Sequence, residues 1–261
     1  MDLNLQNKVA LVIASSQGLG KAIAKQLVSE GANVMLTSRD ETKLAAVQEE
    51  LQSLGKGKVS YFPSDITKVE DIQALVQKTR DTFGKIDILI NNAGGPPGGT
   101  FEQFSDEQWQ KAFELNLLSY IRIIREVLPD LKKEGGRIIN IASTSIKVPI
   151  PGLILSNTFR TGIVGLAKSL AEELAPYNIL VNTVAPGRIA TDRVAYLDQL
   201  KADKQGVSFE QIQEQSRKTI PLGRYGEPEE FAKVVTFLVS DASTYMTGSS
   251  FVVDGGMVKS I

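Results

Sequence analysis

The sequence predicts an α/β protein in which a parallel β-sheet is covered by helices on both faces. Short β-branched runs recur along the 261 residues, and a segment with helical periodicity follows almost every run. This alternation is typical of parallel strands joined by crossover helices. The runs are continuously apolar, as in strands buried on both faces. Because no linker, repeat or low-complexity tract interrupts the chain, we interpret residues 1–261 as a single domain, although the length would also allow two small ones.

The stretch from Lys8 to Glu30 has the pattern of a strand, a glycine turn and a helix. Residues 9–13 are uniformly apolar. Leu19, Ile23 and Leu27 then recur at helical spacing, which is typical of the sheet-facing side of a helix. The turn between the two elements therefore lies at a helix N-terminus.

That turn contains the glycines that a phosphate site needs. It consists of Ser15, Ser16, Gln17, Gly18, Leu19 and Gly20. Free backbone N–H groups and the positive end of the helix dipole favour an anion there, and glycine lets the backbone approach the anion closely. A dinucleotide is the leading ligand, although tight packing of the strand against the helix would also explain Gly18 and Gly20.

The end of the next strand indicates which dinucleotide. About twenty residues after the turn, such units contact the adenosine ribose. An acidic side chain there would bind the free hydroxyl of NAD, whereas Ser38 and Arg39 leave room and positive charge for a 2′-phosphate. The sequence therefore favours NADP(H) over NAD(H). The alternative is that Arg39 is a solvated residue at the start of the following helix.

The other elements follow from the same patterns. Further strands are predicted over residues 33–37, 59–63, 86–90, 137–141, 180–184 and 250–253. Helices are predicted over residues 41–54, 106–128, 155–174 and 228–239, with one more that runs from a capping box at Thr67 and Glu70 to Gly84. Ser105 and Gln108 form another such box, and Pro228 occupies a favoured first helical position.

Two segments read as loops over the carboxyl end of the sheet. Residues 91–99 are rich in glycine and proline and cannot form the interior of a helix or strand. Residues 188–220 read as a looser insertion with one short helix, which Ser208 and Gln211 would cap. Leu197, Leu200, Val207 and Phe209 in this insertion suggest a lid over an apolar substrate, or ordinary core packing.

Composition excludes several kinds of chemistry. The formal charge of −1 provides no field that would attract nucleic acid or an anionic membrane, and no apolar run is long enough to span a bilayer. We therefore expect a cytoplasmic protein without either partner. The chain has no cysteine and no histidine, so thiol nucleophiles, imidazole bases and the usual zinc sites are excluded, and we expect no metal. Acid–base work would fall to Tyr, Lys, Ser, Asp, Glu or a water.

Several stretches together resemble the short-chain dehydrogenase/reductase family, especially its 3-oxoacyl-(acyl carrier protein) reductase-like members. The resemblance covers essentially the whole chain. The matching pieces are residues 15–20, Asp65, residues 91–94, Asn116, Ser143, Pro186-Gly187 with Thr191, residues 221–224 and residues 254–256. It implies a single Rossmann-type domain with a seven-stranded sheet, a carbonyl or alcohol substrate, and a homotetramer or homodimer.

The resemblance also implies roles for individual residues. Asp65 would contact the adenine, and Asn92, Ala93 and Gly94 would line the cofactor. Pro186, Gly187 and Thr191 would hold its nicotinamide end. Ser143 would bind the substrate carbonyl, and Asn116 would hold a water in a proton relay. Alternatively, Asn116 satisfies backbone groups at a helix kink and Ser143 caps the chain that leaves its strand.

The chain departs from this family at the catalytic acid. Members carry Tyr-x-x-x-Lys where this sequence has Ser156 and Arg160. A serine hydroxyl is far less acidic than a phenol, so Ser156 could hold a water or a substrate oxygen but would donate a proton poorly. Arg160 could bond ribose hydroxyls in place of the lysine but stays protonated. Ile13-Ala14 also replaces a Thr-Gly pair, which would weaken cofactor binding if the backbone needs a glycine conformation.

We therefore predict an NADP(H)-preferring oxidoreductase with atypical catalytic residues, Ser143, Asn116, Ser156 and Arg160. Its proton would come from another group, for which Lys147 and Tyr196 are candidates. The alternatives are a catalytically silent dinucleotide-binding protein and an oligomeric scaffold that has lost the cofactor.

Overall fold

The computed structural model describes residues 2–260. A sheet of seven strands lies at its centre, in the order β3-β2-β1-β4-β5-β6-β7, and every neighbouring pair is parallel. The strands are β1 Val9–Val12, β2 Asn33–Leu36, β3 Val59–Tyr61, β4 Ile88–Asn91, β5 Gly136–Ile141, β6 Ile179–Pro186 and β7 Ser250–Val253. The predicted α/β class with a seven-stranded parallel sheet is confirmed.

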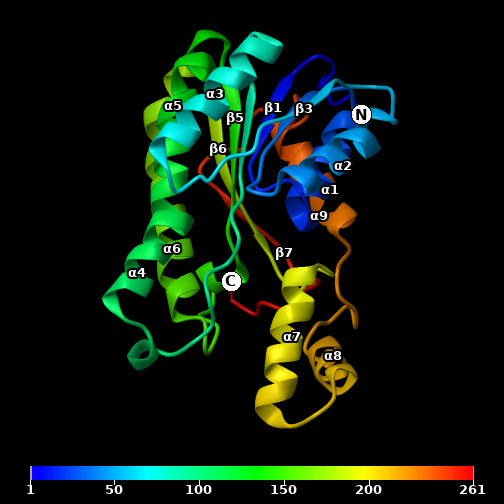
Figure 1. Ribbon diagram of the computed structural model, residues 1–261, viewed down its shortest axis with the longest axis vertical. Coiled ribbons are helices and arrows are strands. Elements are labelled where there is room, and N and C mark those ends of the chain that lie inside the picture. The colour runs from blue at the N-terminus through cyan, green and yellow to red at the C-terminus, as the bar shows by residue number, and fades with distance from the viewer. Residues whose placement is uncertain (1, 261) are drawn as a thin grey trace.

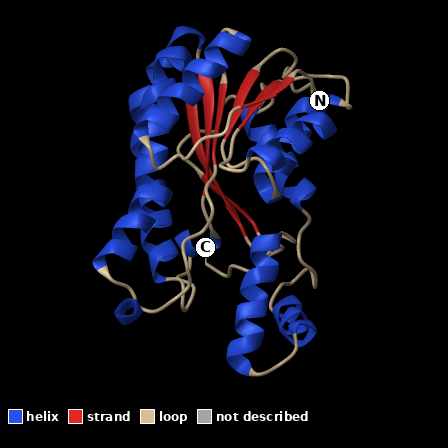
Figure 2. Ribbon diagram, viewed as in Figure 1, coloured by secondary structure: helices blue, strands red, loops and turns tan. Residues whose placement is uncertain are grey.

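Helices cover both faces of the sheet (Figure 1). One layer contains α1 Gly18–Ser29, α2 Glu41–Gln52 and α9 Pro228–Val239, and the other contains α3 Val69–Phe83, α5 Ser119–Glu134 and α6 Ile154–Leu174. The remaining α-helices, α4 Asp106–Phe113, α7 Asp192–Gln205 and α8 Phe209–Lys218, lie at one end, beyond the strands (Figure 2). Short helical turns complete the chain at Phe101–Gln103, Thr144–Ile146 and Ala175–Tyr177, and a π-helical segment spans Glu114–Leu118.

Two apolar cores flank the sheet, and this explains why the strands read as continuous apolar runs. Successive side chains of a strand point to opposite faces. Val12 and Ile90 pack under one helical layer, whereas Leu11 and Leu89 pack under the other. Each strand therefore needs apolar residues at consecutive positions.

The order of the strands creates a crevice at the carboxyl end of the sheet, between β1 and β4. The strands run outward from β1 to β3, and the chain then returns to place β4 on the other side of β1. In open parallel sheets, ligands bind outside the carboxyl ends of the strands at such a reversal. The loops after β1 and β4 therefore lie on either side of the expected ligand.

Several predicted helix boundaries are confirmed. Gly84 ends α3 with a left-handed φ of 83°, and a capping box at Ser105 opens α4. Helix α9 spans Pro228–Val239, with Pro228 in the first turn, and β7 spans Ser250–Val253, as predicted. Within residues 2–260, no helix has both the length and the apolarity needed to cross a bilayer.

The predicted capping box at Thr67 and Glu70 is wrong. Thr67 donates from both its backbone nitrogen and its hydroxyl to a carboxylate oxygen of Asp65, at 3.0 and 2.8 Å. It therefore belongs to an Asp-centred turn, and α3 begins only at Val69.

The prediction of one regular helix over residues 106–128 is correct only in part, because the helix is interrupted and ends later. It widens into the π-helical segment Glu114–Leu118 and then continues as α5 through Pro129 to Glu134. A proline removes only one helical hydrogen bond, and contacts beyond it hold the last turn in place. Asp130, for example, accepts a hydrogen bond from Arg80 of α3 at 2.8 Å.

Residues 188–220 are more regular than predicted. The predicted capping box at Ser208 is confirmed and opens α8. The preceding helix, α7, was not predicted, because its apolar residues do not form a continuous stripe. Thr191 caps this helix, and its side chain accepts from the backbone of Val194.

Candidate functional site

A cavity of about 1040 Å³ opens at the carboxyl end of the sheet. Its walls come from the turns after β1, β2, β3, β4, β5 and β6 and from α6 and α7. The predicted cofactor residues that line it are Ser16, Gln17, Gly18, Leu19, Arg39, Asp65, Asn92, Ala93, Gly94, Pro186, Gly187 and Thr191, and the predicted catalytic residues are Ser143, Ser156 and Arg160. Folding thus collects most of the predicted site residues around one space.

Two predicted cofactor residues do not line the cavity. Ser15 is completely buried, and its hydroxyl accepts a hydrogen bond from the backbone of Thr37 at 2.9 Å. Gly20 lies inside the first turn of α1, where a Cβ would collide with the carbonyl oxygen of Ala14. The Ser15 hydroxyl is therefore used inside the protein, and the absence of a Cβ at Gly20 lets the turn close tightly; any contact of Gly20 with a cofactor would come from its backbone N–H group.

The turn before α1 has the properties of an anion site. Among residues 2–260, the N–H groups of Gly18, Leu19 and Gly20 have no hydrogen-bond acceptor. The first turn of α1 contains no acidic side chain, and no side chain caps the helix. Unpaired N–H groups at the positive end of a helix dipole, beside a large cavity, fit the phosphates of a dinucleotide.

Ala14 keeps the backbone shape of this turn without a glycine. Its φ is 51°, in the left-handed region where a Cβ is unfavourable. Its carbonyl oxygen accepts a hydrogen bond from the Asn92 side chain at 3.3 Å, which joins the turn to the loop after β4. Ala14 is therefore held in a left-handed conformation that glycine would adopt more easily.

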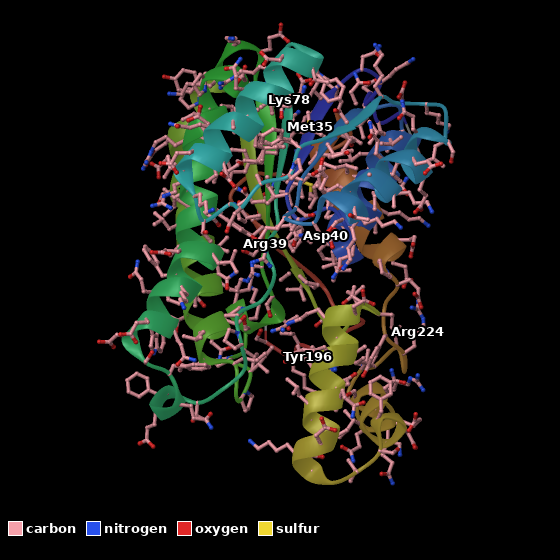
Figure 3. All side chains as sticks on the ribbon, viewed as in Figure 1. Met35, Arg39, Asp40, Lys78, Tyr196 and Arg224 are labelled. Carbon is pink, nitrogen blue, oxygen red and sulfur yellow. The ribbon has the colours of Figure 1, made fainter. Side chains whose placement is uncertain are left out.

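Two cations stand beside the turn at the β2 end of the cavity. Arg39 and Lys43 both line it, and Figure 3 labels Arg39 and Asp40 near the middle of the molecule. Asp40 caps α2 by accepting from the backbone of Lys43. The Lys43 ammonium group then donates to the side chain of Gln17 at 3.1 Å. Lys43 thus brings a second positive charge close to Arg39, where the 2′-phosphate is predicted to bind.

Asp65 lines the same end of the cavity as an anion. Partial burial alone would raise its pKa, but hydrogen bonds from Thr67 and the charge of Arg39 hold the pKa below its usual value. Asp65 is therefore ionised at neutral pH, available as a hydrogen-bond acceptor.

The other end of the cavity contains Ser143, Ser156 and Arg160. Ser143 follows β5 in extended backbone, and its hydroxyl accepts a hydrogen bond from the backbone of Ser145 at 3.2 Å. It thus caps the chain that leaves the strand and also faces the cavity. Ser156 lies one turn before Arg160 on α6, which places the two side chains on the same side of the helix.

Arg160 is anchored in the protein rather than free in the cavity. Its side chain is 4% exposed. One guanidinium nitrogen donates to the Tyr120 hydroxyl at 2.9 Å and to the carbonyl oxygen of Ile141 at 2.8 Å, and the other donates to the carbonyl oxygen of Ala93 at 2.9 Å. Arg160 thus ties together the ends of β4 and β5 and leaves fewer donors for ribose hydroxyls than the sequence suggested.

Asn116 lies behind the cavity, in the π-helical segment, and does not line it. Its amide nitrogen donates to the carbonyl oxygen of Gly94 at 2.8 Å, which orients the loop after β4. Its side-chain oxygen is buried and has no partner among the described residues. Buried polar atoms usually have a partner, often an ordered water.

Neither of the proton donors predicted from sequence lines the cavity. Lys147 is exposed in the turn after β5, and Tyr196 is 55% exposed on α7, where Figure 3 labels it. Of the apolar lid residues, Leu197 lines the cavity, whereas Leu200, Val207 and Phe209 do not. Only Leu197 of these four side chains therefore supports an apolar substrate.

Three residues of the site were missed from sequence. Lys43 could have been found from the cap at Asp40, which places it close to Arg39. Arg193 lies in α7, a helix that was not predicted. Tyr120 gave no local signal, because its contact with Arg160 joins residues of two different helices.

Comparisons with known proteins agree with this geometry. Residues 13–258 match the family described as "Enoyl-(Acyl carrier protein) reductase". The chain is 37% identical over 258 residues to the 3-oxoacyl-(acyl-carrier-protein) reductase of Aquifex aeolicus, covering 98% of this chain and 100% of that one. It is 36% identical over 256 residues to human dehydrogenase/reductase SDR family member 4, covering 97% of this chain and 88% of the relative.

Solved structures of reductases have the same fold. The L-sorbose reductase of Gluconobacter frateurii, complexed with NADPH and L-sorbose, matches with a TM-score of 0.95 at 32% identity and 100% coverage of both chains. A single-residue variant of the actinorhodin polyketide ketoreductase, with NADPH, matches with a TM-score of 0.92 at 34% identity, covering 96% of this chain and 97% of that one.

Proposed function

The chain belongs to the short-chain dehydrogenase/reductase family, and from this premise we propose that it is an NADP(H)-dependent oxidoreductase that interconverts a carbonyl and an alcohol. One observation carries the proposal. A single cavity of about 1040 Å³ connects a turn suited to phosphates with a polar end that contains Ser143, Ser156 and Arg160. A dinucleotide and a small substrate would meet in this space.

The cations at the β2 end support NADP(H) over NAD(H). Arg39 and Lys43 would bind the 2′-phosphate, and Gln17 holds the Lys43 ammonium group in place. Charge-assisted hydrogen bonds of this kind are stronger than neutral ones. Two similar structures, the L-sorbose reductase and the polyketide ketoreductase, contain NADPH.

At the other end, the chain must hold a carbonyl group and provide it with a proton. When NADPH is bound, it would supply a hydride to the carbonyl carbon. The hydroxyl groups of Ser143 and Ser156 would hold the carbonyl oxygen, and the Arg160 cation would stabilise the negative charge that develops there. Because neither serine is an adequate acid, the proton would come from a water. The side-chain oxygen of Asn116, which is buried behind the cavity and has no partner among the described residues, would accept a hydrogen bond from such a water.

A second candidate function is a catalytically silent dinucleotide-binding protein. The hydrogen bonds of Arg160 favour it, because three N–H groups of the guanidinium are used to bind protein oxygens. In this case Arg160 would be a structural tie at the site of a lost catalytic lysine.

Calorimetric titration with NADPH and NADH tests the proposed cofactor. We expect NADPH to bind more tightly. Arg39→Ala and Lys43→Ala should each weaken NADPH about tenfold and leave NADH nearly unchanged, because only NADPH has the 2′-phosphate. Lys25→Ala is the matched control, since Lys25 pairs with Glu50 outside the cavity.

Two results decide between the candidates. Failure of both nucleotides to bind at millimolar concentration would contradict both proposals and favour a scaffold. If NADPH binds, a panel of ketones and aldehydes separates the enzyme from the silent protein. Reduction that falls about a hundredfold in Ser143→Ala supports the enzyme, because the serine would bind the developing oxyanion.

A homotetramer or homodimer also belongs to this proposal. Large apolar side chains are exposed away from the cavity, among them Phe101 at 69%, Leu222 at 67% and Tyr245 at 101%. Association between copies of the chain would cover such side chains.

A further inference from the structure

Two arginines line the substrate end of the cavity from different elements. Arg160 comes from α6 and is almost completely buried, whereas Arg193 comes from the first turn of α7 and is partly buried. Arg160 has a role in the proposed function, but Arg193 does not.

Arg193 reaches from the lid to the loop after β4. It donates to the carbonyl oxygen of Pro96 at 2.7 Å. Its guanidinium lies so close to Gly95 that a Cβ there would come within 3.2 Å of one nitrogen. The side chain is therefore held at the cavity wall, with its charge beside the cavity.

Both guanidinium groups donate hydrogen bonds only to neutral oxygens, and each also lies over the ring of a tyrosine. The partners of Arg160 are two carbonyls and a hydroxyl, and the partner of Arg193 is a carbonyl. Among residues 2–260, no carboxylate lies within ion-pair distance of either group. Glu114 and Asp192 also line the cavity, but Glu114 accepts from Gln110, and Asp192 is exposed.

The two positive charges disfavour one another. Burial lowers the pKa of Arg193, Tyr196 partly opposes this, and the nearby charge of Arg160 lowers the pKa further. Cations that are taken out of water cost free energy unless an anion compensates them. A ligand that brings a negative charge would supply this compensation.

We propose that Arg193, supported by the charge of Arg160, binds an acidic group of the substrate, so that the substrate is a small carbonyl compound that carries a carboxylate. This inference rests on the proposed function, because it places the substrate in the same cavity. Leu153, Val194 and Leu197 line the cavity as well and would contact a short carbon chain between the two polar groups.

Binding of matched acids and esters to the protein–NADP⁺ complex tests this inference without requiring turnover. The probes are short hydroxy acids, with the hydroxyl at the second, third or fourth carbon, and their methyl esters. Calorimetry should show that at least one acid binds about tenfold or more tightly than its ester, since an ion pair with a partly buried arginine is lost in the ester.

Variants at one position assign the preference to Arg193. Arg193→Met should remove the preference for the acid, and Arg193→Lys should retain part of it. Lys201→Met is the matched control, because Lys201 is an exposed cation on the same helix outside the cavity. It should leave the preference unchanged.

Three results would overturn the inference. Equal binding of acids and esters to the wild-type complex would exclude an acid site. If Arg193→Met weakens NADP⁺ itself and leaves the ratio between acid and ester unchanged, the anion is the pyrophosphate of the cofactor. If NADP⁺ and NADPH do not bind at all, the proposed function fails first, and this outcome is distinct from a failure of the acid site.

Discussion

Ala14 illustrates how one residue can keep a turn while straining it. Its φ of 51° is the conformation that a glycine would adopt freely at this position. The surrounding contacts impose it, since the Asn92 side chain bonds to the Ala14 carbonyl and Gly20 packs against the same atom. The prediction that this position needs a glycine-like backbone agrees with the structure.

We expect Ala14→Gly to stabilise the protein by about 1 kcal/mol. The left-handed conformation costs a residue with a Cβ about 1–2 kcal/mol, and the greater freedom of glycine in the unfolded chain offsets part of this gain. Urea denaturation measures the change. Ala46→Gly is the control, because Ala46 lies within α2, where glycine should instead destabilise by about 1 kcal/mol. Destabilisation by Ala14→Gly would show that the turn is not strained.

Arg160 and Tyr120 form a buried hydrogen-bonded pair. Burial raises the pKa of the Tyr120 hydroxyl, and the charge of Arg160 partly opposes the shift. The hydroxyl therefore stays protonated and donates to the carbonyl oxygen of Ile141 at 3.0 Å while it accepts from Arg160. Tyr120 is fully buried and outside the cavity, so it supports the arginine rather than donating a proton to a substrate.

Tyr120→Phe should destabilise the fold by about 1–2 kcal/mol, because both hydrogen bonds of the hydroxyl are lost from a buried place. A double-mutant cycle with Arg160→Met should give a coupling of about 1 kcal/mol. Tyr61→Phe serves as the control, since its hydroxyl has no partner among residues 2–260. Additive effects of the two substitutions would contradict the pairing.

At the scale of elements, α7 and α8 are joined to the body of the protein by a buried network. Asp198 of α7 is completely buried and pairs with Arg188, which follows β6. The Tyr225 hydroxyl donates to the other carboxylate oxygen of Asp198 at 2.7 Å from the segment that precedes α9. The charge at the centre of α7 therefore fixes the position of the helix that carries Arg193.

We expect Asp198→Asn to loosen this attachment at a cost of about 2 kcal/mol, because it leaves the partly buried Arg188 without its anion. Hydrogen exchange should become faster in α7 and α8 and remain unchanged in β1 and β4. Asp203→Asn is the control, since Asp203 is exposed on α7 and its side chain bonds only to Gln199. Equal exchange in the Asp198 variant and the wild type would show that other contacts hold the lid.

For the whole molecule, the order of the strands decides where the site lies. The chain leaves β1 for β2 and β3 and returns to β4 on the other side of β1. This reversal separates the loops after β1 and β4 and leaves the space that the cavity occupies. The cavity then extends past β5 and β6 to α7, so that a dinucleotide end and a substrate end lie in one space.

The sequence by itself determined the seven strands, most of the helices and the phosphate turn. These features depend on local patterns, namely continuous apolar runs, helical periodicity and glycine at a helix start. The end of a predicted strand indicated Arg39, and the resemblance to a known family indicated Ser143, Ser156 and Arg160; all four line the cavity. Helix α7 escaped prediction because its burial is centred on Asp198, a charged residue that gives no apolar stripe.

Only the tertiary structure decided what the site residues contact. Contacts such as those of Arg160 with Tyr120, or Arg193 with Pro96, join residues that are far apart in the chain, and no local pattern encodes them. Folding likewise buried Ser15 and left Lys147 and Tyr196 outside the cavity. The physical reason is that burial and the pairing of charges depend on how distant segments pack together, whereas secondary structure depends mainly on neighbours in sequence.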